Sequence, residues 1–352
     1  MKEHISNTGP ACIFLLGVND SRTAIVKGFN SSGKLDYDWE GNTEFSTYTN
    51  TPAKNKKIMP ILWFQKETQK ISAPDIFVNC ISDADNMTKS LTKAIHYLDA
   101  AAQQRPGIPL FNDPRKIAGT RRDMIYQRFH GLPGIEIPKI FRFQPENRDA
   151  VLATAEKEGF TYPFIVRRCG AHNGKDMVLL EAPGRESALD CLALDGAYFY
   201  LTQFRDYKNA AGLYSKARFV IMDGKIYPRH FITARHWKIS AGSRNDLMKD
   251  SANLRDLEQQ SLASLSKIIA PEALDSAQKI YQDAGLDYLG FDCSVRPDGQ
   301  LLIFEINASM NAMARSDYSL FHYIKDCVDN LIDGYNSLLA AKIGARDIRR
   351  HA

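Results

Sequence analysis

Two carboxylates and an amide interrupt apolar, strand-like sequence in the last fifth of the chain. Asp292, Glu305 and Asn307 lie among residues such as Leu, Ile, Phe and Val. The intervening Asp298-Gly299 dipeptide is a strong hairpin signal, because both residues tolerate the positive φ angles of a two-residue turn. We therefore predict two antiparallel strands on either side of this turn, over 288–297 and 300–307.

The register of this hairpin decides which side chains share a face. If Pro297 faces Gln300 across the turn, Asp292 lies directly opposite Glu305. The same register gives the pairs Ser294–Ile303 and Arg296–Leu301. One face then carries Asp292, Ser294, Glu305 and Asn307, and the other face, which we expect to meet the core, carries Phe291, Cys293, Val295, Leu302, Phe304 and Ile306.

The facing carboxylates of Asp292 and Glu305 need a compensating cation. Like charges directly opposite each other destabilise a strand pair by roughly 0.2–1 kcal/mol, and more when they are half-buried. Hard oxygen ligands suit Mg²⁺ or Mn²⁺, which keep several water ligands and also bind substrate phosphates. We predict a divalent metal site at Asp292, Glu305 and Asn307. A solvated acidic face on an ordinary hairpin is the alternative.

A second Asp-Gly hairpin carries cations instead of acids. In "YSKARFVIMDGKIYPRHF" we predict that Met222 faces Lys225 across Asp223-Gly224. This register gives the pairs Arg218–Arg229 and Lys216–Phe231, and it leaves Ala217, Phe219, Ile221, Ile226 and His230 on the other face. Three cations on one face are unfavourable unless an anion bridges them, so we predict an anion site. A solvated basic face is the alternative.

A glycine-rich loop between two strands adds further positive charge. In "YPFIVRRCGAHNGKDMVLLE", Gly170 and Gly174 can expose backbone N–H groups in a turn. The loop is surrounded by the basic side chains of Arg167, Arg168, His172 and Lys175. Backbone N–H groups and basic side chains together bind phosphates. The two hairpins and this loop therefore predict a site for a nucleoside triphosphate with a divalent metal.

The composition is that of an ordinary globular protein of 352 residues. The net charge is only +4 and no run of Lys or Arg alternates with aromatic residues, so we predict no nucleic-acid partner. The six cysteines form no CxxC pair, which favours buried thiols in a reducing cytoplasm. The apolar run "ACIFLLGV" is too short to span a bilayer, so it predicts a first strand and no membrane association.

Apolar runs and helical periodicity predict an α/β part followed by α+β parts. The runs "ACIFLLGV", "IMPILWF" and "DIFVNC" read as buried strands beside a helix over 86–103, whereas 29–57 reads as an irregular insertion. A helix start follows at "NDPRKIAG". We then expect strands at 138–143, 163–168, 176–181 and 197–204, helices near 147–158 and 185–193, a helical stretch at 252–285 between the two hairpins, and a last helix over about 318–342.

Over 111–340 the sequence resembles the ATP-grasp superfamily. "GFDCSVRPDGQLLIFEINAS" resembles its metal-binding strands, "PFIVRR" its first nucleotide-binding strand and "GAHNGKDM" its flexible loop over the phosphates. "YLTQF" is similar to the hinge beside the adenine, with Thr202-Gln203 where a glutamate is common, and "TRRDMIYQRF" is similar to the helix before the central lobe. The resemblance implies an ATP-grasp fold of α/β and α+β type with an N-terminal, Rossmann-like preATP-grasp domain. The implied domains are 1–110 (preATP-grasp), 111–204 (central lid subdomain) and 205–352 (C-terminal subdomain with the metal and phosphate site).

The resemblance also implies roles for single residues. The metal ligands would be Asp292, Glu305 and Asn307, holding two Mg²⁺ or Mn²⁺ ions. The ATP-binding residues would be Arg122, Arg167, His172, Lys175, Gln203, Phe204, Arg205, Lys216 and Arg218. Of these, Lys175 and Arg218 would act in catalysis by clamping phosphates, and Arg229 would steady the group in transfer.

The resemblance implies an ADP-forming carboxylate-amine ligase. In that family a substrate carboxylate attacks the γ-phosphorus of ATP, and an amine captures the acylphosphate to form an amide or peptide bond. The expected partners are small-molecule carboxylate and amine substrates, and a homodimer is among the expected assemblies. An ATP-grasp kinase that phosphorylates a hydroxyl, and a nucleotide-binding regulatory protein without turnover, are the alternatives.

Some positions depart from the family pattern or suggest a substrate pocket. Gly290 stands where D-alanyl-D-alanine ligases carry an arginine, so we do not expect that subclass. After Asn307 the chain lacks the Pro-Gly of several amino-acid ligases. Candidates for the acceptor pocket are His230, His236, Trp237 and Lys238, and Arg315 is a candidate substrate anchor.

Overall fold

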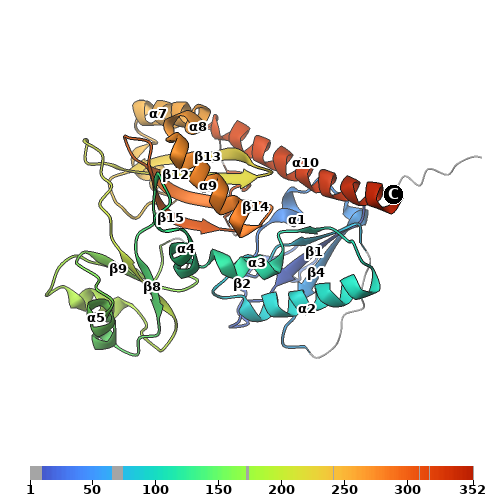
Figure 1. Ribbon diagram of the computed structural model, residues 1–352, viewed down its shortest axis with the longest axis horizontal. Coiled ribbons are helices and arrows are strands. Elements are labelled where there is room, and N and C mark those ends of the chain that lie inside the picture. The colour runs from blue at the N-terminus through green and yellow to red at the C-terminus, as the bar shows by residue number, and fades with distance from the viewer. Residues whose placement is uncertain are drawn as a thin grey trace, which may run out of the picture.

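The computed structural model describes residues 10–65, 74–171, 174–240, 242–308, 310–316 and 318–351, with side chains up to Ala345. The predicted site residue His172 lies outside these residues. Within the described residues, four sheets are present (Figure 1). No helix among them has the length and apolar character that crossing a membrane requires.

The N-terminal sheet is parallel, with the strand order β4-β1-β5-β6, and it confirms the strands predicted from the three apolar runs. Its elements are β1 (Cys12–Gly17), β4 (Lys56–Ile61), β5 (Ile76–Asn79), β6 (Leu110–Phe111) and α2 (Thr88–Gln104). The prediction that 29–57 is irregular is wrong in part, because short elements occur there. They are β2 (Ile25–Phe29), which pairs with β3 (Leu35–Asp38), α1 (Phe45–Tyr48) and the 3₁₀ helix η1 (Ala53–Asn55).

The central sheet is antiparallel, with the order β10-β9-β11-β8, and it packs on its own hydrophobic cluster. Asn147 caps the helix of this part, because its side chain accepts a hydrogen bond from the backbone N–H of Ala150. Its elements are β8 (Ile140–Phe143), α5 (Arg148–Lys157), β9 (Phe164–Arg168), β10 (Met177–Leu180), η3 (Glu186–Cys191) and β11 (Phe199–Gln203). They are preceded by α3 (Pro114–Ile117), η2 (Ala118–Thr120), α4 (Arg122–Phe129) and β7 (Ile135–Glu136).

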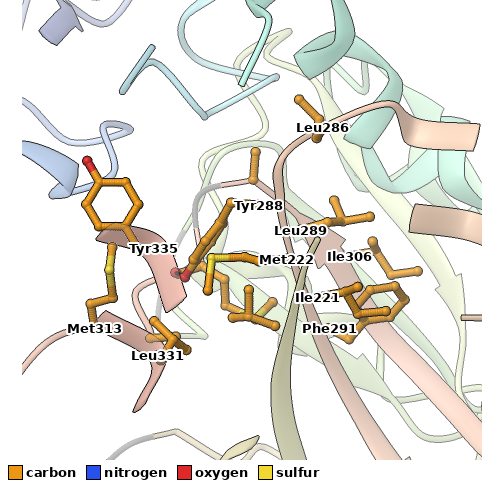
Figure 2. Packing of buried hydrophobic residues seen from close by; sticks show 14 of the residues in the cluster. Ile221, Met222, Leu286, Tyr288, Leu289, Phe291, Ile306, Met313, Leu331 and Tyr335 are labelled. Atoms are coloured by element: carbon orange, nitrogen blue, oxygen red, sulfur yellow. Dashed lines mark hydrogen bonds between the residues drawn. The ribbon is translucent and has the colours of Figure 1, made fainter. Parts of the chain in front are cut away.

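The C-terminal sheet has the order β13-β12-β14-β15-β7 and shares one hydrophobic cluster with the N-terminal sheet. Phe219 and Phe291 stack on neighbouring strands with ring centroids 4.9 Å apart. Figure 2 shows part of this core and labels Tyr288 and Tyr335, whose ring centroids each lie 5.2 Å from that of Phe45. The elements are β12 (Tyr214–Met222), β13 (Lys225–Ala234), α6 (Ser243–Leu247), α7 (Ala252–Ala263), α8 (Leu265–Ile268), α9 (Pro271–Ala284), β14 (Tyr288–Val295), β15 (Leu301–Asn307) and α10 (Ile324–His351).

The β14–β15 hairpin pairs Asp292 with Glu305, which confirms the prediction. The predicted pairs near the turn are wrong by one residue, because the turn contains three residues and not two. Arg296 donates its backbone N–H to Gln300, and Gly299 has the positive φ, of 81°. A three-residue loop with glycine in the left-handed region is a common hairpin connection. The observed pairs are Ser294–Leu302 and Val295–Leu301.

A bulge in β15 restores the predicted pairing at Asp292. Phe304 is the extra residue, because Cys293 faces Ile303 whereas Asp292 faces Glu305. A bulge re-aims side chains, and here Phe304 lines a cavity together with Leu302. The prediction that Leu302 and Phe304 belong only to the apolar core face is therefore wrong.

The β12–β13 hairpin has the predicted turn. Met222 faces Lys225, and the two turn residues both have positive φ angles, of 49° at Asp223 and 69° at Gly224. This is the geometry for which an Asp-Gly pair is favoured in a two-residue hairpin loop. The sequence therefore predicted this end of the ribbon correctly.

A bulge at Arg229 changes the register beyond that turn. Phe219 faces Pro228, whereas Arg218 faces His230, so Arg229 is the extra residue. Pro228 has no N–H for the strand ladder, and proline within sheets occurs at edges and bulges. The prediction that Arg229 lies opposite Arg218 is therefore wrong. The predicted pair Lys216–Phe231 is also wrong, because Lys216 faces Ile232.

Helix α10 connects the C-terminal sheet to the N-terminal part, as Figure 1 shows. The Asn336 side chain donates to the carbonyl of Tyr48 at 2.9 Å and accepts from the N–H of Asn50 at 2.6 Å. Lys342 pairs with Asp287 at 2.6 Å. The helix thus adds polar contacts to the core that the two sheets share.

Candidate functional site

A large cavity of about 1300 Å³ lies between the central and C-terminal sheets. The central sheet lines it with apolar side chains, from Ile140, Ile165 and Met177. Aromatic side chains also line it, namely Phe204, Tyr207, Trp237 and Phe304. The charged lining residues include Arg122, Arg167, Lys216, Arg218, Asp292 and Glu305. The cavity therefore has an apolar, aromatic part and a charged part.

Asp292 is buried in the charged part and is bound by two cations. Arg218 donates to both carboxylate oxygens, with Nε–Oδ1 2.6 Å and Nη2–Oδ2 2.7 Å, and Lys216 Nζ donates to Oδ2 at 3.1 Å. Burial by itself raises the pKa of Asp292, but Arg218 and Lys216 lower it well below its ordinary value. Asp292 is therefore an anion at neutral pH.

Glu305 faces Asp292 and pairs with a different cation. Arg122, the first residue of α4, donates from Nη2 to Glu305 Oε2 at 2.8 Å and from Nη1 to the carbonyl of Phe304 at 2.7 Å. Burial tends to raise the pKa of Glu305, but Arg122 and Arg167 lower it below its ordinary value. The helix and the β15 bulge thus hold the second carboxylate in place.

The oxygen atoms of Asp292, Glu305 and Asn307 fit a hard divalent cation. The adjacent strands β14 and β15 carry all three residues. Two carboxylates and one amide do not complete a Mg²⁺ shell, so water and phosphate oxygens have to supply the other ligands. In the part of the chain that the structure describes, no group of three His, Cys, Asp or Glu side chains could hold a metal. A metal at this site would therefore take its other ligands from water or from a bound phosphate.

Arg167 on β9 is a cation without a carboxylate partner among the described residues. Its Nη2 donates to the carbonyl of Ala171. Burial and the nearby Arg122 lower the pKa of Arg167 to about 10. An arginine held near another cation, without an acid of its own, favours the binding of an anion.

The hinge segment that follows β11 borders the apolar part of the cavity. The Gln203 side chain is engaged elsewhere, because its Nε2 donates to the carbonyls of Thr161 at 2.8 Å and Pro163 at 2.9 Å. The backbone N–H of Gln203 donates to the carbonyl of Lys139, and that of Phe204 donates to Pro163. These two N–H groups are therefore not free to donate to a ligand at the hinge, which has to form hydrogen bonds with other backbone groups.

Lys238 reaches the glycine-rich loop from the C-terminal part of the chain. A Cβ atom added to Gly174 would lie 2.4 Å from Cε of Lys238, so the lysine stem crosses this glycine. Trp237 packs edge-on against Phe204 with ring centroids 5.6 Å apart, and its carbonyl accepts a hydrogen bond from the hydroxyl of Tyr207. Tyr207 is not among the predicted site residues, and Lys238 was predicted to line an acceptor pocket. Contacts between loops that are distant in sequence leave no local sequence pattern from which they could be predicted. The aromatic residues that follow β11 were the sequence feature that could have indicated an aromatic wall of the cavity.

His230 has the position in the cavity that we predicted for Arg229. The His230 side chain is buried and lines the cavity, and its Nε2 has no hydrogen-bond partner among the described residues. Burial, Arg218 and Lys216 lower the pKa of His230 well below its ordinary value. Arg229 instead donates from Nε to the carbonyl of Ala312 at 2.7 Å, and it is not one of the cavity-lining residues.

Comparisons with known proteins identify the fold. No protein-family model matches the sequence, and a search of curated proteins found no match. Among solved structures, the D-alanine–D-alanine ligase from Bacillus anthracis matches with a TM-score of 0.50 and 14% sequence identity, over 97% of this chain and 98% of that chain. Its complex with ATP matches with the same values. The chain has the ATP-grasp fold.

Most of the predicted site residues line the large cavity of this ATP-grasp fold. They are Arg122, Arg167, Gln203, Phe204, Arg205, Lys216, Arg218, Asp292 and Glu305. Asn307 lines a second, smaller cavity beside Glu305. Lys175 is exposed, and the lining of neither cavity includes it. Arg315 has a side chain that is 63% exposed and pairs with Asp329 at 3.3 Å, and His236 is not in the lining of either cavity.

Proposed function

We propose that this protein is an ATP-dependent ligase that activates a small carboxylate as an acylphosphate and joins it to an amine. The observation that carries the proposal is the facing pair Asp292–Glu305 in the charged part of the cavity, where the other charged side chains are arginines and lysines. Facing acids and surrounding cations match a metal-bound triphosphate, since the metal balances the acids and the phosphates balance the cations. The ATP complex of a ligase with the same fold supports the choice of nucleotide.

We place the nucleotide along the large cavity. The purine packs between the apolar side chains of the central sheet and Phe304. The backbone N–H groups of Gln203 and Phe204 already donate to carbonyls of the protein, so the backbone N–H of Arg205 and nearby carbonyls contact the purine edge. Phosphates are bound by Arg167, Lys216, Arg218 and Lys238, with Lys175 from the glycine-rich loop. Arg229, which is directed toward the loop after β15, has no phosphate contact in this proposal.

Asp292, Glu305 and Asn307 would hold two Mg²⁺ ions together with phosphate oxygens. Metal ions at such a site neutralise the developing charge on the phosphates during transfer. Arg218 and Lys216 would then move from Asp292 to phosphate oxygens, because the ion pairs that they make with Asp292 compete with metal binding. Arg122 would likewise exchange Glu305 for a negatively charged ligand group.

The proposed chemistry has two steps. A carboxylate oxygen of the substrate attacks the γ-phosphorus, the bond to the β–γ bridging oxygen breaks, and ADP leaves. An amine then attacks the acyl carbon, the acyl–oxygen bond breaks, inorganic phosphate leaves, and the amine loses a proton. The protein supplies position and positive charge, which account for most of the acceleration in phosphoryl transfer.

The test is a screen for ADP release with Mg²⁺, ATP and panels of small acids and amines. A ligase releases ADP with an acid and yields a hydroxamate when hydroxylamine replaces the amine. A kinase would release ADP without a hydroxamate, and a regulatory protein would bind ATP without releasing ADP; either result contradicts the proposal.

Glu305→Gln connects this activity to the site. The variant keeps the shape of the side chain but removes a metal ligand, so we expect substrate-dependent ADP release to fall by about 10²–10³-fold. Glu156→Gln changes an exposed glutamate of helix α5 in the central part and is the matched control. Full activity of Glu305→Gln would contradict the site assignment.

A further inference from the structure

A second cavity, of about 430 Å³, adjoins the proposed nucleotide site. Arg122, Arg167 and Glu305 line both cavities, so the two meet at the second proposed metal ligand. The second cavity extends from there to the loop 82–86 of the N-terminal part. A molecule bound in it would thus have one end at the proposed transferring phosphate and the other end at this loop.

The wall of the second cavity that faces the nucleotide is cationic. Arg122 is paired with Glu305, and Arg121 donates to both oxygens of Asp123 at 3.1 and 3.0 Å. Arg167 is different, because among the described residues it is hydrogen-bonded to a carbonyl and to no carboxylate. Arg167 borders both cavities and its guanidinium has five N–H donors, so it can bind a phosphate oxygen and also the anionic end of a ligand in the second cavity.

The part of the lining that the loop 82–86 forms, here called the acidic wall, carries Asp83 and Asp85. Asp85 accepts hydrogen bonds on both oxygens from the Tyr200 hydroxyl, at 2.8 and 3.0 Å. Its nearest cation is Arg142, whose Nε lies 3.7 Å from Asp85 Oδ1, which is too long for a hydrogen bond. A carboxylate has about four acceptor positions, so Asp85 can accept further hydrogen bonds. Asp83 lines the same wall and adds negative charge.

The loop after β9 holds this acidic wall in place. Asn86 donates from its side chain to the carbonyl of Gly170 at 3.0 Å, and a Cβ atom at Gly170 would lie 1.9 Å from Asn86 Nδ2. Gly170 has a positive φ of 70°. The loop 82–86 and the central sheet therefore hold Asp85 and Tyr200 at one place, which is a requirement for a selective binding site.

We infer that the second cavity binds a small zwitterion, an amino acid, with its carboxylate at Arg167 and its ammonium group at Asp85. The inference rests on the proposed ligase function, because it names the class of acid that is activated. The orientation is the productive one, since it directs the carboxylate toward the γ-phosphate. The second cavity is the smaller of the two, which favours a single amino acid over a peptide.

The environment of Asp85 also favours a cationic ligand group. Burial raises the pKa of Asp85 and the neighbouring Asp83 raises it further, whereas the Tyr200 hydrogen bond and the more distant Arg142 and Arg122 lower it, with a net shift upward. A carboxylate in this situation is stabilised as an anion by a nearby ammonium group. An acid that lacks the amine would leave Asp85 buried without that compensation.

The test measures ligand binding by calorimetry, with the full chain saturated with Mg²⁺ and the non-hydrolysable analogue AMP-PNP. The probes are the twenty common amino acids, D-alanine and β-alanine, followed by the des-amino and N-acetyl forms of the tightest binder. A charged hydrogen bond implies that these two forms bind about ten- to a hundred-fold more weakly. Equal binding of the des-amino form, or no binding by any amino acid, would overturn the inference.

Two variants locate the ammonium site. Asp85→Asn should remove most of the preference for the amino acid over its des-amino form, and Tyr200→Phe should reduce that preference. The control Asp190→Asn changes an exposed carboxylate and should retain the preference. An unchanged preference in a folded Asp85→Asn variant would also overturn the inference; if that variant does not fold, the ligand series with the unaltered chain still decides it. Binding of an amino acid without ADP release would instead reject the proposed ligase and leave the zwitterion site intact.

Discussion

At the scale of single residues, the site keeps its acids in ion pairs that a metal-bound nucleotide has to replace. Arg218 and Lys216 hold Asp292, and Arg122 holds Glu305. Phosphate oxygens can accept these cations while a metal takes the carboxylates, so that no buried charge is left alone. The sequence predicted these residue types and their cavity, but not which cation would pair with which acid.

Asp292→Asn tests the ion pairs directly. The amide keeps the shape of the side chain but leaves Arg218 and Lys216 half-buried without a carboxylate. Breaking a buried pair on one side costs about 3–5 kcal/mol, so we expect the free energy of unfolding in urea to fall by that order. Asp190→Asn, which removes an exposed pair with Arg148, should cost less than about 1 kcal/mol. Equal losses in the two variants would contradict the account.

His230 predicts a dependence of stability on pH. Burial lowers the pKa of His230, and the nearby cations Arg218, Lys216, Arg229 and Arg244 lower it further. As the pH falls through 6.5, the ordinary value, the unfolded chain takes up a proton at His230 and the folded chain does not, so acid favours unfolding.

The size of this effect can be measured with a variant. Between about pH 7.5 and about pH 5.5 the His230 contribution should lower the free energy of unfolding by about 1 kcal/mol. His230→Gln should lose correspondingly less stability over the same range. Parallel pH profiles of the two proteins would show that His230 does not stay neutral in the folded state.

At the scale of elements, the two hairpins show what strand patterns can and cannot predict. The Asp-Gly signal predicted the β12–β13 turn correctly. The predicted Asp292–Glu305 pair is also present, but only because the Phe304 bulge offsets a turn that is one residue longer than predicted. The bulges at Phe304 and Arg229 were not predictable, because an extra residue in a ladder leaves no periodic signal beyond Pro228 itself. They decide that Phe304 and His230 enter the cavity and that Arg229 does not.

The two hairpin turns allow a matched pair of glycine substitutions. Gly299 and Gly224 have positive φ angles of 81° and 69°. A Cβ atom at Gly299 would lie 2.6 Å from the backbone N of Ala270, whereas nothing lies within 4 Å at Gly224. We expect Gly224→Ala to cost about 1 kcal/mol from backbone strain and Gly299→Ala to cost about 1–3 kcal/mol more from the clash. Urea denaturation measures both, and equal costs would contradict the tight contact at Gly299.

At the scale of the whole molecule, the N-terminal and C-terminal sheets share one core, and the central sheet has its own. The apolar runs predicted all three sheets, since buried strands and amphipathic helices have clear periods. The shared core was not predictable, because it joins residues that are distant in sequence, such as Phe45 and Tyr335. The domain limits at 110 and 204 and the cytoplasmic location stay predictions.

The contact between α10 and the N-terminal part predicts a difference between two asparagines of one helix. Asn336 makes hydrogen bonds with Tyr48 and Asn50, whereas Asn330 is exposed. Alanine favours helix over asparagine by about 0.5 kcal/mol, so Asn330→Ala should be neutral or slightly stabilising. Asn336→Ala should lower the free energy of unfolding by about 1–2 kcal/mol, because two partners lose their hydrogen bonds. Equal effects in thermal or urea unfolding would contradict this role of α10.

We propose that Asp292, Glu305 and Asn307 bind the metal of a metal–nucleotide complex in the large cavity. Anomalous X-ray diffraction from crystals grown with Mn²⁺ and AMP-PNP tests it most directly. We expect a manganese peak within about 2.0–2.3 Å of carboxylate oxygens of Asp292 and Glu305, with Arg218 turned toward the phosphates. A nucleotide bound elsewhere, or a peak remote from both carboxylates, would contradict it.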